Sequence, residues 1–174
     1  MQINVAQLLK EPTGSSRTIQ VDDTVCLDQD EEFHVRGDAH LLRLAKGILA
    51  RGTFTTERQF LCSRCLAPYG QTLVFQVEEE FSPSVDVASG LPLPLPEDST
   101  TFAIDEHHIL DMTELIRQYS LLTTPMKPLC KPDCAGLCPR CGTNLNQNLC
   151  QCTASTETAF SLAFKKLKSA RKSR

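Results

Sequence analysis

The chain has 174 residues, 41% of them hydrophobic, and a formal net charge of −3. This length suits one domain, or one domain with an appendage. No stretch approaches the roughly 18 apolar residues that a membrane-spanning helix needs, and the first residues lack the basic and apolar regions of a secretory signal. We therefore expect a protein without a membrane partner, in a reducing compartment that keeps cysteine thiols reduced.

Charge is unevenly distributed along the chain. The last ten residues contain six basic residues and no acidic residue, so the rest of the chain has 12 basic and 21 acidic residues. A body of net charge −9 repels nucleic acid. Any nucleic-acid contact should therefore be confined to the basic tail and to the loops near the cysteines.

The N-terminal third has a weak structural pattern. Residues 1–10 predict a short amphipathic helix, with Asn4 as its N-cap and apolar side chains on one side. Residues 11–34 are polar and mixed, and only residues 18–21 weakly favour a strand.

From residue 35 onward the strand pattern strengthens. Three strands are predicted, over residues 39–45, 48–61 and 72–81, with a turn at residues 46–47. Alternation in the third strand puts Leu73, Phe75 and Val77 on one face. Cys62 and Cys65 then lie at the tip between the second and third strands.

A linker and a helix follow. Residues 82–100 contain four prolines, which predicts an extended connector. Asp111 is the predicted N-cap of the helix, and Glu114 completes a capping box. The predicted buried stripe consists of Met112, Leu115, Ile116, Tyr119 and Leu122. Pro125 bounds this helix, and a second, shorter helix is predicted around residues 160–167.

Eight of the nine cysteines form four close pairs, which are Cys62-x2-Cys65, Cys130-x3-Cys134, Cys138-x2-Cys141 and Cys150-x-Cys152. Two thiolates so close in sequence lie on one tight turn, and two such turns make a tetrahedral four-sulfur site for Zn2+. Eight ligands predict two zinc sites. Sites without an open coordination position are structural, so we expect zinc to supply folding energy rather than reactivity.

The spacing allows two pairings. In the preferred arrangement one site contains Cys138, Cys141, Cys150 and Cys152, since the loop between these pairs is short and Gly142 lets the backbone turn behind the second ligand. The other site then contains Cys62, Cys65, Cys130 and Cys134, joined across the linker. The rival arrangement combines Cys130 and Cys134 with Cys138 and Cys141, and leaves Cys62 and Cys65 unpaired.

Other uses of these residues stay open: an iron–sulfur cluster, a thioredoxin-like role for Cys62 and Cys65, and metal ligation by His107-His108. We expect Cys26, which has no near partner in the sequence, to be a buried, inert thiol. No set of serine, histidine and aspartate, no glycine-rich phosphate loop and no spaced carboxylate pair stands out. We therefore expect no enzymatic activity and no small-molecule substrate.

Together these patterns predict an α+β fold: an antiparallel β-sheet with a zinc-knuckle hairpin, a short capped helix and a C-terminal zinc ribbon followed by a helix. Residues 1–81 form the N-terminal helix and antiparallel region, and residues 82–100 form the linker. Residues 101–174 contain the helix, the cysteine-rich ribbon and a basic C-terminal helix or tail. We expect one domain overall.

Two separated motifs are distinctive. The first is Leu61-Cys-Ser-Arg-Cys-Leu66, followed by Glu78-Glu79-Glu80-Phe81. The second is Pro125-x-x-Pro128-Leu-Cys-Lys-Pro-Asp-Cys-Ala-Gly-Leu-Cys-Pro-Arg-Cys-Gly-Thr-Asn-Leu-Asn146, together with Cys150-x-Cys152. With both motifs the sequence resembles the cysteine-rich branch of the YceD family, which is named for accumulation of large-subunit ribosomal RNA. The likeness covers roughly residues 39–170.

The resemblance implies a cytoplasmic, non-enzymatic bacterial factor needed for normal 23S rRNA levels; a related plastid branch leaves the plastid stroma open as a location. Relatives often carry an aspartate and an arginine after the last cysteine pair, where this chain has Ala154-Ser-Thr-Glu-Thr-Ala-Phe160. If that arginine binds RNA or a partner, we expect Lys165, Lys166 and Lys168 to replace it here.

The predicted function is ribosome assembly, by binding precursor 23S rRNA or a large-subunit ribosomal protein. Zinc would hold rigid loops whose basic side chains meet phosphates. The candidate contacts are Arg64, Lys127, Lys131, Arg140, Lys165, Lys166, Lys168, Arg171, Lys172 and Arg174. The alternatives are a zinc-stabilised protein–protein adaptor that never contacts RNA and, less favoured, a thiol oxidoreductase.

Overall fold

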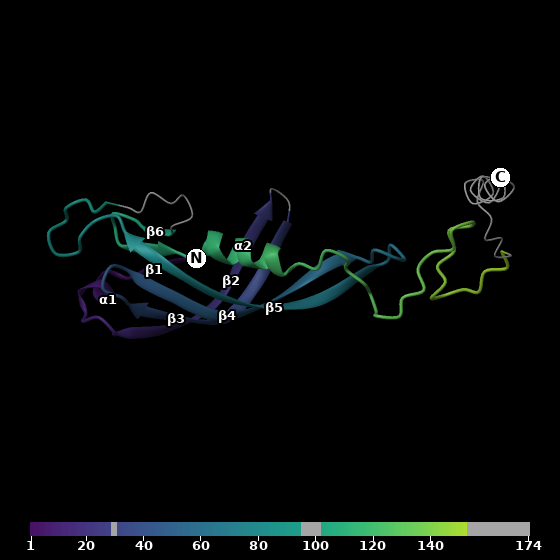
Figure 1. Cartoon of the computed structure of the whole chain (residues 1–174), viewed down its shortest axis with the longest axis horizontal. Coiled ribbons are helices and arrows are strands. Elements are labelled where there is room, and N and C mark those ends of the chain that lie inside the picture. Colours follow the sequence, from purple (N-terminus) through teal and green to yellow (C-terminus); the bar gives the residue numbers. More distant parts are fainter. Residues whose placement is uncertain (29–30, 95–101, 153–174) are drawn as a thin grey trace, which may run out of the picture. The chain divides into compact units, whose positions relative to one another are not determined.

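The computed structural model describes residues 1–28, 31–94 and 102–152. Within these residues, seven strands form one sheet in the order β1-β7-β6-β5-β4-β3-β2 (Figure 1). Neighbouring strands are antiparallel, except that β5 and β6 are parallel. The bounds are β1 Gln2–Asn4, α1 Ala6–Lys10, β2 Ser16–Asp28, β3 Glu31–Arg43, β4 Ile48–Leu61, β5 Pro68–Pro83, β6 Phe102–Ile104, β7 Ile109–Asp111 and α2 Thr113–Thr123. The prediction of a mostly antiparallel sheet with helices is confirmed.

The chain divides into two compact units. Unit 1 consists of residues 1–61 and 68–128, and it holds the sheet and both described helices. Unit 2 consists of residues 62–67, the loop that connects β4 to β5, and of the chain from residue 129 onward. Each unit is therefore built from two separate stretches of sequence.

The hairpin of β4 and β5 carries the first cysteine pair at its turn. The two strands are paired along the whole of β4. Burial alternates along both, because successive side chains of a strand point to opposite faces of the sheet. In β5 the buried side chains are Leu73, Phe75, Val77 and Phe81. The predicted strand at 48–61 and the one-sided burial of residues 72–81 are confirmed.

The hairpin of β2 and β3 is barely indicated by the sequence. In β2, Val21, Val25 and Leu27 are buried, and the residues between them are exposed. A strand with one solvated face needs few apolar residues, which is why residues 11–34 look too polar for a strand of this length. Cys26 is exposed, so the expectation of a buried thiol is wrong. Its place between Val25 and Leu27 puts it on the solvated face.

Phe54 is a fully buried residue of β4 whose ring packs against Phe75, with the ring centroids 5.9 Å apart. Two glycines make room for this ring. A Cβ atom at Gly52 would lie 2.6 Å from Cε2 of Phe54, and a Cβ atom at Gly37 would lie 2.7 Å from its Cδ1. The aromatic ring thus occupies the space that side chains at these two positions would fill.

The first ten residues do not form one helix. Residues 2–4 form β1, which pairs with β7 so that Ile3 lies opposite Leu110. Helix α1 starts only at Ala6, with Val5 as the N-cap, although the Ala6 N–H does donate to Oδ1 of Asn4 at 3.1 Å. The predicted short helix is therefore confirmed at residues 6–10, with Leu8 and Leu9 buried, but its N-cap is Val5 rather than Asn4. Residues 2–4 lie outside it because a strand far along the sequence pairs with them.

Helix α2 begins without the predicted capping box. Its N-cap is Met112, and Asp111 ends β7, where its Oδ1 accepts the Thr113 N–H at 2.8 Å. The Glu114 carboxylate instead accepts two hydrogen bonds from Arg117 at 2.7 Å each. The capping box is wrong, because the Glu114 side chain bonds to Arg117 instead of turning back to Asp111. Asp111 ends β7 and still supplies a side-chain acceptor to the first turn of α2.

Helix α2 packs against β2 and β5 and closes the core of unit 1 (Figure 1). Leu115 and Ile116 are fully buried, as predicted. Leu122, however, is 79% exposed, while Ser120 is buried and its hydroxyl donates to the Arg117 carbonyl at 2.8 Å. The predicted stripe is thus wrong at its last member, because the core ends before the final turn of α2.

The stretch predicted as a linker contains the end of β5 and an isolated bridge between Val85 and Pro92. The Asp86 carboxylate accepts the backbone N–H groups of Ala88 and Ser89 in the turn between them. Strands β6 and β7, which the sequence pattern does not indicate, extend the sheet toward β1.

Some predictions concern residues outside the described ones. These are the proline-rich residues 95–100, the helix at 160–167 and the basic residues from Lys165 to Arg174. In the part of the chain that the structure describes, neither helix has the length and apolar character needed to cross a lipid bilayer.

Replacing Phe54 with alanine should lower the free energy of unfolding by about 3–5 kcal/mol, because it empties a fully buried ring site. Urea denaturation measures the change. The matched control is Val74→Ala in β5, where the side chain is 58% exposed, and it should stay within about 0.5 kcal/mol of the parent. Equal effects of the two variants would contradict the assignment of the core.

Candidate metal centres

The eight paired cysteines converge in two groups of four. Centre 1 consists of Cys62, Cys65, Cys130 and Cys134, and centre 2 consists of Cys138, Cys141, Cys150 and Cys152. Within each group all sulfur atoms lie within 4.8 Å of one another. All nine cysteines are free thiols. The sulfur positions follow the first of the two pairings that the sequence allows, and not the rival that joins the middle four cysteines.

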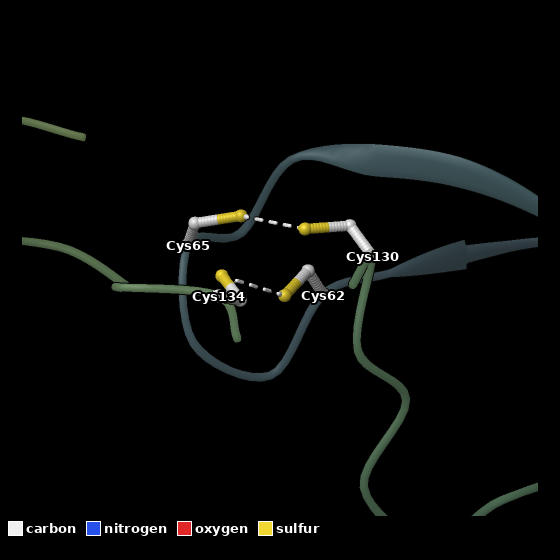
Figure 2. Close-up of side chains that lie close together, drawn as sticks. All are labelled: Cys62, Cys65, Cys130 and Cys134. Carbon is white, nitrogen blue, oxygen red and sulfur yellow. Dashed lines mark hydrogen bonds between the residues drawn. The ribbon is translucent and has the colours of Figure 1, made fainter. Parts of the chain in front are cut away.

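In centre 1 two loops bring their thiols face to face (Figure 2). Cys62 and Cys65 come from the loop after β4, and Cys130 and Cys134 come from the chain after α2. The Sγ atoms of Cys62 and Cys134 are 3.7 Å apart, as are those of Cys65 and Cys130. Cys62, Cys65 and Cys134 are buried, with at most 5% exposure.

The loop of residues 62–66 is a tight turn. The Leu66 N–H donates to the Cys62 carbonyl at 2.9 Å, and Leu66 has a φ of 57°, in the left-handed region that is unusual for leucine. The same turn recurs in centre 2, where the Gly142 N–H donates to the Cys138 carbonyl at 2.9 Å and φ is 71°. Both CxxC pairs thus aim their sulfurs with one backbone geometry.

Centre 2 is smaller and more exposed than centre 1. The Sγ atom of Cys150 lies 3.3 Å from that of Cys138 and 3.4 Å from that of Cys141. Backbone N–H groups face the sulfurs: Arg140 donates to Cys138 at 3.5 Å, and Cys152 donates to Cys150 at 3.2 Å. Cys138 is buried, Cys150 is half-buried, and Cys141 and Cys152 are exposed.

These separations suit a single tetrahedral ion. Four ligands with metal–sulfur bonds of about 2.3 Å are separated by about 3.8 Å along each tetrahedral edge. Centre 1 matches this edge at 3.7 Å, and the two edges of centre 2 are shorter by a few tenths of an ångström. A disulfide, at about 2.05 Å, is far shorter than any of them. Each group of four cysteines could therefore hold one metal ion.

The thiols of centre 1 differ in acidity. Hydrogen bonding from the Cys130 backbone lowers the pKa of Cys62 to about 6. Burial, together with a hydrogen bond to Cys65, raises the pKa of Cys130 to about 12. For Cys134, burial is outweighed by hydrogen bonds such as that from Asn146, and the pKa is lowered.

Centre 2 likewise contains thiols with a lowered pKa and thiols with a raised pKa. Hydrogen bonds from the Thr143 side chain and backbone lower the pKa of Cys141 to about 6. Hydrogen bonding to Cys150 raises the pKa of Cys152 to about 12. Some thiols in each group thus ionise easily and others resist, according to their burial and hydrogen bonds. Four thiolates at one point would in addition repel one another. A bound cation removes this repulsion, and all four sulfurs then serve as ligands.

The basic residues that were predicted to contact phosphate groups lie in different parts of the chain. In unit 2, Arg64 donates to the Cys134 carbonyl at 2.9 Å, which ties the two loops of centre 1 together. Lys131 and Arg140 are exposed beside centre 1 and centre 2, and Lys127 is exposed in unit 1. The six basic residues of the tail lie outside the described part of the chain.

The histidines at 107–108 lie in the turn between β6 and β7 in unit 1, and neither joins a cysteine group. Two contributors to the centres were not predicted. Leu66 occupies the same turn position as Gly142, a parallel that could have been noticed in the sequence. Asn146 donates from Nδ2 to Sγ of Cys134 at 3.3 Å, and only the structure brings them together.

Elemental analysis of the purified protein should find about two metal atoms per chain. Cys62→Ser and Cys150→Ser should each remove about one atom, because each removes one ligand from a different closed site. Cys26→Ser, which alters a cysteine outside both groups, is the control and should retain both atoms. If either variant retains both atoms, the assignment of its cysteine to a four-sulfur site is wrong.

Metal affinity should fall as the pH falls. Cys130 and Cys152, whose pKa values are raised to about 12, hold protons at neutral pH that the metal must displace. Cys62 and Cys141, whose pKa values are lowered to about 6, begin to compete through protonation only as the pH drops through that value. Calorimetric titrations with Zn2+ in buffers of different ionisation enthalpy should therefore show proton release at pH 7 and weaker binding below pH 6. Binding that is independent of pH would contradict thiol ligation.

A protein-family model described as "Large ribosomal RNA subunit accumulation protein YceD" matches residues 50–169. The chain is also similar to uncharacterized proteins of Mycobacterium bovis and Mycobacterium tuberculosis, with 31% identity over 109 residues, which is 62% of this chain and 50% of theirs. An uncharacterized protein of Mycobacterium leprae is 26% identical over 108 residues, 62% of this chain and 48% of its own length.

The chain therefore spans about half the length of the curated relatives it matches. No solved structure matches it. The matching family model covers more than half of the chain, including β5, all of β4 except its first two residues, and both cysteine groups. The chain belongs to the YceD family.

Proposed function

We propose that this chain is a non-enzymatic factor in ribosome biogenesis, which supports accumulation of 23S rRNA by binding its precursor through unit 2. Membership of a family described by large ribosomal RNA subunit accumulation supports a ribosome-related role. The finer proposal, direct contact with RNA, is carried by the distribution of charge between the two units.

Acidic residues are concentrated in unit 1, which holds 19 of the 21 aspartates and glutamates. In unit 2 the only acidic residues are Asp133 and Glu157, against nine lysines and arginines. Phosphate groups are repelled by the first unit and attracted by the second. The separation of charge therefore favours an RNA contact restricted to unit 2.

Zinc is the proposed metal at both centres. The donors are all sulfur, each group holds four of them, and the separations fit one ion per group. In a [4Fe–4S] cluster each cysteine binds a different iron atom, and in a [2Fe–2S] cluster two cysteines bind each of two irons. Both need the four sulfurs spread over a larger site than one shared ion does. With four protein ligands no position stays open for water, so the proposed role of zinc is structural.

The proposed zinc sites hold two knuckle turns and a short ribbon in fixed positions. Arg64, Lys131 and Arg140 stand on or beside these turns and are exposed. They are the proposed phosphate contacts among the described residues, and the tail residues named above are proposed to add attraction that depends on salt.

A protein–protein adaptor is the second candidate function. Its support is the apolar surface of unit 2, where Leu66 is 63% exposed and Leu149 is 99% exposed. A large-subunit ribosomal protein is the proposed partner in that case. A thiol oxidoreductase has less support, because Cys62 and Cys65 are 0% and 5% exposed and a reactive thiolate must be accessible.

Filter binding of 23S rRNA fragments across a series of salt concentrations tests RNA contact. Affinity should fall linearly in log salt, and Lys131→Ala and Arg140→Ala should each reduce the slope by about 0.7–0.9, the value of one lost phosphate contact. The control is Arg36→Ala, an exposed arginine on the sheet of unit 1, which should leave the slope unchanged.

Two outcomes would reject an RNA contact through unit 2. One is the absence of binding to 23S fragments at low salt by protein that carries its full complement of metal. The other is an equal loss of slope in Arg36→Ala, which would place the contact on unit 1. In the first case, co-purification with large-subunit proteins that is lost in Leu66→Ser would favour the adaptor.

A further inference from the structure

The side chain of Asn146 belongs to the loop of one metal centre and contacts a ligand of the other. Asn146 lies between the two cysteine pairs of centre 2, yet its Nδ2 donates to Sγ of Cys134 in centre 1 at 3.3 Å. The same Nδ2 donates to Oδ1 of Asn144 at 2.9 Å, and Oδ1 of Asn146 accepts the Ala135 N–H at 2.9 Å. Because a backbone donor occupies Oδ1, the orientation of the amide is determined and Nδ2 must face the sulfur.

This loop is anchored at its start by backbone hydrogen bonds and ends at a cysteine of centre 2. The loop is held at its start by the Cys138 N–H, which donates to the Thr143 carbonyl at 2.8 Å, and by the Leu145 N–H, which donates to the Gly136 carbonyl at 2.9 Å. Its far end is Cys150, a ligand of centre 2. A metal ion that binds Cys150 together with Cys138 closes the loop and removes its freedom to move.

We propose that Asn146 is a positioning residue for centre 1 and that it couples the two centres. When metal fills centre 2, the closed loop presents the Asn146 amide to Cys134, and centre 1 then binds its metal more tightly. The inference rests on the proposal that both centres bind zinc. By linkage, metal in centre 1 strengthens binding at centre 2 by the same factor.

The physical basis is the hydrogen bond to a ligand. An N–H donor stabilises the thiolate of Cys134, orients its sulfur and removes part of the repulsion among four thiolates. Loss of such outer partners typically costs about 10–100-fold in metal affinity. When no metal closes loop 141–150, the Asn146 amide must become ordered as centre 1 binds its metal, and this ordering costs entropy. The metal affinity of centre 1 is then lower, by a part of the about 10–100-fold that complete loss of the hydrogen bond would cost.

The test measures the zinc affinity of centre 1 by chelator competition in the full chain. The centre 1 phase is the one that disappears in Cys62→Ser. Asn146→Leu keeps a similar side-chain volume but removes the donor, and it should weaken this phase about 10–100-fold. The matched control is Asn148→Leu, an exposed asparagine in the same loop, which should leave the phase within about twofold.

Coupling is tested by combining variants. Cys150→Ser, which disables centre 2, should also weaken centre 1, and Asn146→Leu should add little to that loss because both act through the same hydrogen bond. Additive losses in the double variant would overturn the coupling. Asn146→Asp is nearly isosteric and puts a carboxylate beside the thiolate, so it should weaken centre 1 at least as much as Asn146→Leu even if the leucine variant folds poorly.

A spectroscopic readout separates ligand positioning from general stabilisation. With Co2+ in place of zinc, the sulfur-to-cobalt charge-transfer bands of centre 1 should shift in Asn146→Leu and Asn146→Asp, and not in Asn148→Leu. The proposal for Asn146 is overturned if its variants bind two metal atoms with an unshifted spectrum and an unchanged affinity at centre 1. That result leaves the zinc proposal intact. Failure of the parent protein to bind metal at either centre overturns the zinc proposal as well.

Discussion

Four thiolates can share one point only when a cation compensates their charge, and this constraint applies to both cysteine groups of unit 2. Among the residues of unit 2 that the structure describes, the buried ones are Cys62, Cys65, Cys134, Gly136 and Cys138. The interior of this described part therefore consists largely of cysteine side chains. Small units with little apolar interior commonly hold their shape through metal or covalent links, and in such units metal binding and folding are one process.

The two units differ in the composition of their interior and in their charge. Unit 1 has an apolar core between one face of a sheet and the helix α2, and it carries most of the acidic residues. Unit 2 is basic, and the buried residues of its described part are mostly cysteines. The strands β4 and β5 lead directly into the loop of residues 62–67, so the first cysteine turn continues the chain of the hairpin. The apolar core and the cysteine groups thus belong to different parts of one chain.

The sequence pattern correctly predicted the features that depend on residues close together in the chain. Period-two alternation identified β4 and most of β5, because each buries one face, and the spacing of Cys138, Cys141, Cys150 and Cys152 predicted centre 2, whose ligands lie within one short loop. The same reasoning failed where the structure of a segment is set by pairing with a segment distant in the sequence. Residues 2–4 pair with β7 instead of belonging to the predicted helix, and Asp111 ends β7 while Met112 is the N-cap of α2.

The sequence by itself determined the number of ligands, their grouping into close pairs and the separation of acidic from basic residues, because these depend only on which residues are neighbours in the chain. Tertiary structure decided which distant pairs share centre 1, whose facing sulfurs are 65 and 72 residues apart in sequence. It also decided that Asn146 faces Cys134 and that Leu122 is exposed. Contacts of this kind follow from how the loops and the sheet fold back on themselves, and no local spacing encodes them.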